Sequence, residues 1–108
     1  MLETRFIDSI GRIRIPRKIG RALGYKPKTQ TDCQRVEVTL EFGKICIRKF
    51  EKEGFEKRAN VGLIRPVDIN SRVVIPPEYR NILGIDEYSP IDGEVDYESE
   101  TIRFWKAA

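Results

Sequence analysis

The sequence contains no histidine, and this absence excludes several kinds of site. Without histidine the chain has no Ser-His-Asp or Cys-His nucleophile pair and no histidine-based metal site. Its two cysteines, Cys33 and Cys46, are too few for a structural zinc site or a disulfide framework, and they form either two free thiols or one disulfide. A glycine-rich phosphate loop is also missing. We therefore expect no enzymatic activity, no small-molecule substrate, no metal and no cofactor.

Long apolar runs are also absent. No stretch approaches the roughly 20 apolar residues of a membrane-spanning helix, and the start, Met1–Arg5, lacks the apolar segment of a secretory signal. The 108 residues are 40% hydrophobic and 34% charged, a composition typical of a globular chain with one compact domain or two very small ones. These features predict a cytoplasmic protein that does not contact a membrane.

The charge is distributed unevenly along the chain. Residues 1–54 carry 13 Lys and Arg and 7 Asp and Glu, whereas residues 55–108 carry 7 and 10. The two parts therefore have net charges of +6 and −3, although the whole chain is only mildly basic at +3. This polarity favours a protein with one face that meets a polyanion.

An internal repeat is the strongest pattern in the sequence. Residues 5–24 align with residues 65–84 without a gap, and seven of the 20 aligned positions are identical. The identical pairs are Arg5/Arg65, Asp8/Asp68, Arg12/Arg72, Ile15/Ile75, Pro16/Pro76, Leu23/Leu83 and Gly24/Gly84. Two copies are too few for a solenoid. We interpret the chain as a duplicated small domain, with one repeat in 1–50, a charged linker in 51–61 and the second repeat in 62–108.

Each copy has the same expected order of elements. In the first copy, short strands at 5–8 and 12–15 flank a turn and precede a short helix at about 17–23. In the second copy, a strand that ends at residue 68 and a strand at 72–75 precede a helix at about 77–83. A glycine ends each helix. A hairpin follows, with its turn at Gly43-Lys44 in the first copy and near Glu98–Glu100 in the second. The side chains expected to alternate inward are Val36, Val38, Leu40, Phe42, Ile45 and Ile47, then Val95, Tyr97, Ile102 and Phe104.

One such ββαββ copy is near the size at which a single core is marginal, and its hairpins would expose strand edges. Two copies can remove both problems by interleaving. We therefore predict a mainly β fold in which the two repeats intertwine into one shared barrel, as a dimer fused within a single chain would.

The repeated motif resembles that of a known family of DNA-binding domains. The residues that carry the resemblance are Asp8–Pro16 with Leu23-Gly24, and Asp68–Glu78 with Ile82–Ile85. They are similar to the AbrB/MazE/MraZ (SpoVT-AbrB) swapped-hairpin, or double-split, β-barrel group, and the resemblance covers nearly the whole chain apart from the linker. The resemblance implies a pseudo-dimer that binds double-stranded DNA and regulates transcription.

The resemblance also implies which residues contact DNA. In the family these are mostly arginines, three residues before the motif aspartate, four residues after it, and on the short helix. The matching residues here are Arg5, Arg65, Arg12, Arg72, Arg21 and Arg80. The second copy departs from the pattern because Ser71 replaces the motif glycine, and its extra carboxylates, Glu78 and Asp86 among them, argue against equal DNA affinity of the two halves.

Further basic residues surround the motif arginines. Arg14, Arg17, Lys18 and Arg21 form a basic cluster on the surface of the second strand and first helix, which favours contacts to phosphates. Arg12 and Arg72 have a second interpretation, because each lies four residues after an aspartate and can pair with it across a tight turn. Both roles hold together if the aspartate orients the guanidinium, whose other donors reach DNA. The aspartates are poor candidates for acid–base chemistry beside a basic neighbour.

The predicted function is therefore sequence-preferring binding of double-stranded DNA in transcription regulation. The alternative is an antitoxin-like module, since the same barrel in some relatives binds both an operator and a toxin. We expect the acidic tail that such relatives add to be missing, because the sequence ends at Trp105–Ala108. The resemblance leaves self-association beyond the pseudo-dimer open. The aromatic residues Tyr88, Tyr97 and Phe104 are expected in the core, and Trp105 in the core or at a partner surface, rather than in base stacking.

Overall fold

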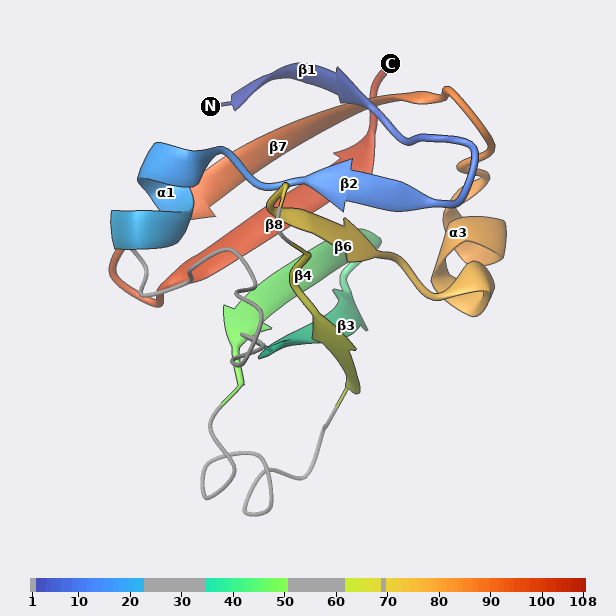
Figure 1. Ribbon diagram of the computed structural model, residues 1–108. Helices are drawn as coiled ribbons and strands as arrows, with labels where there is room; N and C mark the ends of the chain where they lie inside the picture. Colours follow the sequence, from blue (N-terminus) through green and yellow to red (C-terminus); the bar gives the residue numbers. More distant parts are fainter. Residues whose placement is uncertain (1, 23–34, 51–61, 69) are drawn as a thin grey trace.

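Figure 1 shows the computed structural model, which describes residues 2–22, 35–50, 62–68 and 70–108. Within these residues the chain forms eight strands and two short helices. In chain order they are β1 (Leu2–Phe6), β2 (Arg12–Arg14), α1 (Arg17–Ala22), β3 (Arg35–Glu41), β4 (Lys44–Lys49), β5 (Leu63–Pro66), β6 (Arg72–Val74), α3 (Pro77–Leu83), β7 (Pro90–Asp96) and β8 (Thr101–Lys106). The prediction of a mainly β protein is confirmed.

The strands form two antiparallel sheets. Six of them make one sheet in the order β1-β7-β8-β4-β3-β5, and β2 and β6 pair as a separate ribbon. Two strand pairings, β3 with β4 and β7 with β8, are local hairpins. The other four join a strand before residue 50 to a strand after residue 62: β1 with β7, β2 with β6, β3 with β5, and β4 with β8. Most of the sheet structure therefore depends on both parts of the chain.

The large sheet is open as far as the described residues show. Its outermost strands are β1 and β5, and no pairing between these two strands closes a barrel. In Figure 1 the β2–β6 ribbon lies between the two helices, with α1 (blue) at one end and α3 (orange) at the other. The ribbon and helices thus form a second layer beside the six-stranded sheet.

The ends of α3 agree with the sequence prediction. Pro77 occupies the first turn, where its missing amide proton costs no hydrogen bond, and Gly84 follows the last residue in the left-handed region at φ 67°. The amide of Ile85 donates to the carbonyl of Arg80 at 2.9 Å, which satisfies one terminal acceptor. Helix α1 begins as predicted, whereas the predicted stop at Leu23-Gly24 lies outside the described residues.

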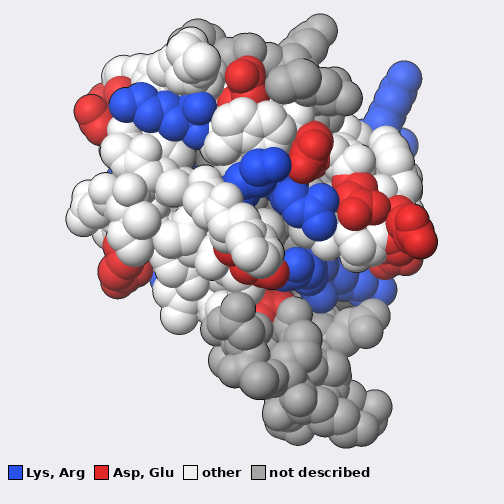
Figure 2. Space-filling view, turned by 180° about the vertical axis from the view of Figure 1, so that it is seen from behind, with Lys and Arg blue, Asp and Glu red and all other residues white. Residues whose placement is uncertain are grey.

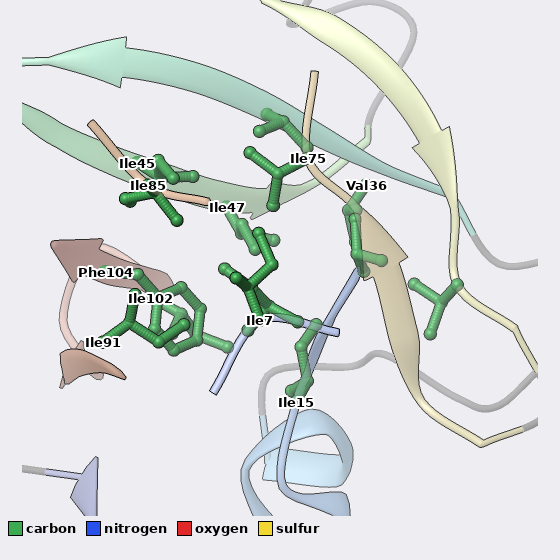
Figure 3. Close-up of a cluster of buried hydrophobic side chains, with 14 residues drawn as sticks. Ile7, Ile15, Val36, Ile45, Ile47, Ile75, Ile85, Ile91, Ile102 and Phe104 are labelled. Carbon is green, nitrogen blue, oxygen red and sulfur yellow. The ribbon is translucent and has the colours of Figure 1, made fainter. Parts of the chain in front are cut away.

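The core fills the space between the two layers. Figure 3 shows side chains of the turn segments, such as Ile7 and Ile15, in one cluster with Ile47 and Phe104 of the large sheet. Its fourteen buried members are Ile7, Ile13, Ile15, Val36, Val38, Ile45, Ile47, Val67, Val73, Ile75, Ile85, Ile91, Ile102 and Phe104. Burying each such side chain contributes about 1.5–3 kcal/mol, so this cluster is the main source of stability.

Three predicted core residues are wrong. Phe42 is fully exposed, Tyr97 is 61% exposed and Tyr88 is 63% exposed. The reason for Phe42 is a shift of the turn by one residue, to Phe42-Gly43, where both residues have positive φ (53° and 75°). This pair of left-handed residues is typical of a two-residue hairpin turn, which points its side chains away from the core. Tyr97 directly follows the end of β7 and belongs to the turn, not the strand.

The start of β5 is held against β3. The Gly62 amide donates to Oε2 of Glu37 at 2.8 Å, and Glu37 is only 1% exposed. A Cβ on Gly62 would lie 2.2 Å from the carbonyl oxygen of Val38, so no other residue fits this approach without movement. The chain therefore enters β5 tightly packed on β3, while the predicted linker 51–61 lies outside the described residues.

Both helices are short, at six and seven residues, and the described part of the chain has no helix with the length and apolar character needed to cross a membrane.

Candidate nucleic-acid interface

The turn before β2 is organised by one carboxylate. Oδ1 of Asp8 accepts hydrogen bonds from the amides of Ile10 (3.0 Å) and Arg12 (2.8 Å), and Oδ2 accepts one from Nε of Arg12 at 2.7 Å. The amide of Gly11 donates to the Asp8 carbonyl at 3.0 Å, and Gly11 takes φ 86°. The aspartate thus fixes the backbone and the arginine side chain together.

The turn before β6 repeats these contacts. Oδ1 of Asp68 accepts from the amides of Asn70 (2.8 Å) and Arg72 (2.9 Å), and Oδ2 accepts from Nε of Arg72 at 2.9 Å. Ser71 stands at the position of Gly11 and takes φ 61°, so the serine leaves the turn in the left-handed region. The predicted ion pair between each motif aspartate and the arginine four residues later is confirmed.

These contacts keep both carboxyls ionised. Partial burial raises the pKa of Asp8 and Asp68, but the hydrogen bonds from backbone amides and from the arginine four residues later outweigh it. The pKa of each aspartate is therefore below its ordinary value. At neutral pH they are fixed anions that orient arginines, which disfavours proton transfer by these groups.

The two turns meet across the β2–β6 ribbon. Ile13 lies opposite Val73 and both are fully buried, so the residues on either side of them face outward. These outward residues are Arg12 opposite Val74 and Arg14 opposite Arg72. The amide of Ile15 donates to the Ser71 carbonyl (2.7 Å) and that of Ile75 donates to the Gly11 carbonyl (2.8 Å). The ribbon therefore places three arginines from both parts of the chain on one outer face.

Side-chain contacts tighten this arrangement. Nη1 of Arg12 lies 3.8 Å from Oδ2 of Asp68, so Arg12 is near both aspartates. Nε of Arg14 donates to the carbonyl of Asn70 at 3.2 Å, which holds the base of an otherwise exposed side chain on the opposite turn. Each guanidinium uses its Nε in the protein and keeps terminal nitrogens that can reach a phosphate or a base edge.

Arg80 of α3 packs on the turn before β2. Its Nε donates to the carbonyl of Ile75 at 3.2 Å, and a Cβ on Gly11 would lie 2.6 Å from its guanidinium carbon. Gly11 therefore makes room for Arg80. At the other turn the large and small residues change places: Ser71 stands at the position of the turn glycine, and Gly20 of α1 stands at the position of the helix arginine. The 60-residue register of the repeat contains this signal, which the sequence reasoning missed.

Helix α1 contributes exposed cations. Ile19 packs against the core, while Arg17, Lys18 and Arg21 are exposed on the other side of the helix. Within the described residues no carboxylate lies within ion-pair distance of these three side chains or of Arg14. The four residues of the predicted basic cluster are thus all exposed on β2 and α1.

Arg5 and Arg65 lie apart from the ribbon contacts. Arg5 is on β1 and Arg65 on β5, the two outermost strands of the large sheet. Nη1 of Arg65 donates to the neighbouring Ile64 carbonyl at 3.0 Å, whereas Nε of Arg5 is buried without a hydrogen-bond partner. Among the described residues no hydrogen bond or ion pair links either of them to the arginines of β2 and β6.

The outer surface of the large sheet has a different character. Figure 2, seen from behind relative to Figure 1, shows basic and acidic side chains interleaved. On these strands Arg48 pairs with Glu41 at 2.7 Å, and Arg103 lies 3.5 Å from Asp96. Lys44 lies 3.6 Å from Glu94, and its Nζ is 4.7 Å from the centre of the Trp105 ring. These cations are already neutralised by neighbours on the sheet.

The predictions for the thiols and the aromatic residues have different outcomes. Cys46 is buried and free, and burial, helped by the charge of Glu41, raises the pKa of its thiol. Cys33 lies outside the described residues. Phe104 is in the core as expected, whereas Tyr88 is 63% exposed beside the first turn, where its amide donates to the Ile7 carbonyl at 2.8 Å.

No protein-family model matches the chain, and no curated protein matches it. The structure also contains, among its described residues, no group of three or more Asp, Glu and Cys side chains placed to hold a metal ion. The arginine face of the ribbon is therefore the candidate site that the contacts themselves define.

Proposed function

We propose that this chain is a double-stranded DNA-binding transcriptional regulator with arginine-mediated contacts to a groove and its phosphates. The observation that carries the proposal is the placement of Arg12, Arg14 and Arg72 on one outer face, two of them held by equivalent aspartates. Partly exposed arginines whose Nε is held in place suit bidentate contacts to phosphates and guanines through their terminal nitrogens. A duplex presents phosphates on both sides of each groove, which fits cations contributed by both parts of the chain.

A proposal about the fold follows from the strand pairings between the two parts of the chain. We propose that the two repeats form a swapped-hairpin pseudo-dimer, in which each repeat supplies strands to complete the other. Support comes from the four strand pairings between the parts and from the equivalent turns at Asp8 and Asp68. In such an arrangement one chain offers what two chains offer in a dimer, namely two copies of the Asp-Arg turn on one side.

The proposal is tested by measuring the affinity for duplex DNA as a function of salt. With about four to six phosphate contacts, the slope of log K against log salt should be about −4 to −5. Arg12→Ala and Arg72→Ala should each weaken binding without unfolding the protein, because both side chains are partly exposed and Asp8 and Asp68 keep their hydrogen bonds to backbone amides. Lys49→Ala is the matched control, since Lys49 is an exposed cation at the far end of β4.

The outcome that would reject the proposal is equally concrete. If both arginine variants leave a gel-shift titration unchanged while circular dichroism shows them folded, the ribbon is not the interface. If the unaltered protein binds no duplex at low salt, DNA binding itself is wrong.

A further inference from the structure

The two ends of the β2–β6 ribbon share one backbone plan. The α1 end consists of α1, Arg14, Asp68, Asn70 and Ser71; the α3 end consists of α3, the turn 8–11 and residues 84–89. The hydrogen bond from Ile15 to Ser71 ties the first end together, and the equivalent bond from Ile75 to Gly11 ties the second. Each turn carries one aspartate paired with one arginine, so the turns themselves are matched in charge.

The α1 end is strongly basic beyond that shared pair. Arg14, Arg17, Lys18 and Arg21 are all exposed there, and none of them has a carboxylate partner in the described part of the chain. Four positive charges within one turn of helix and the adjoining strand form a compact site for the phosphates of one DNA strand.

The α3 end has the opposite character. Glu78 stands at the position of Lys18, and Asp86 and Glu87 follow the helix, all three exposed. One cation of this end opposes them, Arg80, whose guanidinium packs on Gly11. Lys106 of β8 adds a second cation from outside this end, with its Nζ near Gly84. The net charge outside the turn is therefore −2 here, or −1 with Lys106, and +4 at the α1 end.

Apolar exposure accompanies this difference. Ile10, Ile82 and Tyr88 are 59%, 69% and 63% exposed, and all three belong to the α3 end. The α1 end has Asn70 at the position of Ile10 and Ala22 at that of Ile82. Apolar groups and carboxylates do not neutralise phosphates, so this end gains little of the counterion-release free energy that dominates DNA affinity.

We infer that the protein binds DNA asymmetrically, with the α1 end holding one half of the site and contributing most of the phosphate contacts. This inference rests on the proposed function. The preferred DNA site is then not a palindrome: one half-site dominates the affinity, although the two Asp-Arg turns are equivalent. The basic end orients the protein on the duplex, and a regulator that is oriented in this way can act in one direction along it.

Selection from a pool of random duplexes identifies the preferred site, and fluorescence anisotropy with block substitutions in either half measures its symmetry. We expect one block substitution to weaken binding at least tenfold more than the other. A palindromic consensus whose halves lose affinity equally would overturn the inference while leaving DNA binding intact. Failure of the unaltered protein to bind or enrich any duplex would overturn the proposed function, and the inference with it.

Two double variants that each remove two positive charges test which part of the protein binds the dominant half of the DNA site. Arg17→Ala/Arg21→Ala removes two cations from α1, and Arg35→Ala/Lys49→Ala removes two exposed cations from β3 and β4 as the matched control. The first variant should reduce the magnitude of the salt slope by about 2, weaken binding roughly 10- to 100-fold and make the two half-sites nearly equivalent. The control should change affinity less than about twofold. If the α1 variant retains the original preference between half-sites, the α1 end is not its source.

Discussion

The turn before β2 and the turn before β6 are closed by the same hydrogen bonds, yet they carry different neighbours. At the first turn Gly11 lies under the guanidinium of Arg80, and at the second Ser71 has the buried Gly20 at the matching helix position. The comparison separates two roles within one motif. The aspartate and the arginine four residues later determine the backbone path, whereas the helix beside each turn determines which residue is tolerated there and which charge is displayed.

The largest expected effect comes from backbone strain at the first turn. Gly11→Val places a β-branched side chain at φ 86° and also displaces the flexible Arg80 guanidinium, and we expect the free energy of unfolding to fall by about 3 kcal/mol in urea denaturation. Ser71→Gly, the matched change at the second turn, should alter it by less than about 1 kcal/mol. Equal losses in the two variants would show that the turns do not differ in packing.

A mutant cycle isolates the contact with Arg80. Gly11→Ser and Arg80→Ala should couple by about 1 kcal/mol, so that the double variant is less destabilised than the sum of the single variants, because the serine then replaces the lost guanidinium. Strict additivity would mean that strain at φ 86° alone explains the glycine.

The second expected effect concerns the aspartates. Asp8→Asn and Asp68→Asn each weaken three hydrogen bonds to one carboxylate, and a loss of about 1–2 kcal/mol is expected for each. Asp68→Asn should cost more, because Arg12 also lies 3.8 Å from its Oδ2. A larger loss for Asp8→Asn in chemical denaturation would contradict this ranking.

The same carboxylates predict a response to acid. Their folded-state pKa values are lowered, so their stabilisation is fully present above the unfolded-state pKa near 4 and is lost as pH falls toward the folded values. Unfolding measured from pH 6 to pH 2 should therefore show a shallower fall in stability for Asp8→Asn/Asp68→Asn than for the unaltered protein. An unchanged pH dependence would indicate that the turns are not linked to acid stability.

The third prediction concerns a variant in which the two ends of the ribbon are more alike in charge. Glu78→Lys/Asn81→Arg copies Lys18 and Arg21 onto α3, and we expect DNA affinity to rise about tenfold, or about 1.4 kcal/mol, with a steeper salt slope. Glu78→Gln/Asn81→Gln serves as the control without added positive charge. No gain in affinity by titration at several salt concentrations would show that the α3 end does not approach the duplex.

The smallest expected effect is for Glu41, on the outer surface of the large sheet, and it serves as a reference. The hydrogen bond from Arg48 to Glu41, opposed by partial burial, lowers the pKa of Glu41 to about 2. Glu41→Gln should therefore reduce stability by less than about 1 kcal/mol at neutral pH, since the pair is partly exposed, and the difference should shrink as pH falls below 4. DNA affinity should not change, whereas a changed affinity would place the outer sheet surface in the interface.

Local chemistry made the turns and helices predictable from the sequence. An aspartate four residues before an arginine, Pro77 in a first helical turn and a left-handed Gly84 each act within a few residues. The same holds for alternation at Val36, Val38, Ile45 and Ile47. Phe42 was misplaced because a one-residue shift of the hairpin turn places it in the turn instead of at the end of a strand.

Contacts between distant residues were not predictable in the same way. The prediction that the two copies intertwine did not specify that β1 pairs with β7 or that β5 pairs with β3. The packing of Arg80 on Gly11 joins residues 69 positions apart and depends on the path of both turns. Such contacts are determined by how the layers assemble rather than by any local pattern.

The four pairings between the two parts of the chain also govern how the protein is made. A growing chain that has emerged only to residue 50 lacks the strands that β1, β2, β3 and β4 require as neighbours. These strands therefore cannot pair until the chain beyond residue 62 has been synthesised, and they assemble through contacts of long sequence separation, which are slow to form. During that interval the first hairpin exposes unpaired strand edges, so the nascent polypeptide passes through an aggregation-prone stage that ends only when its second half arrives.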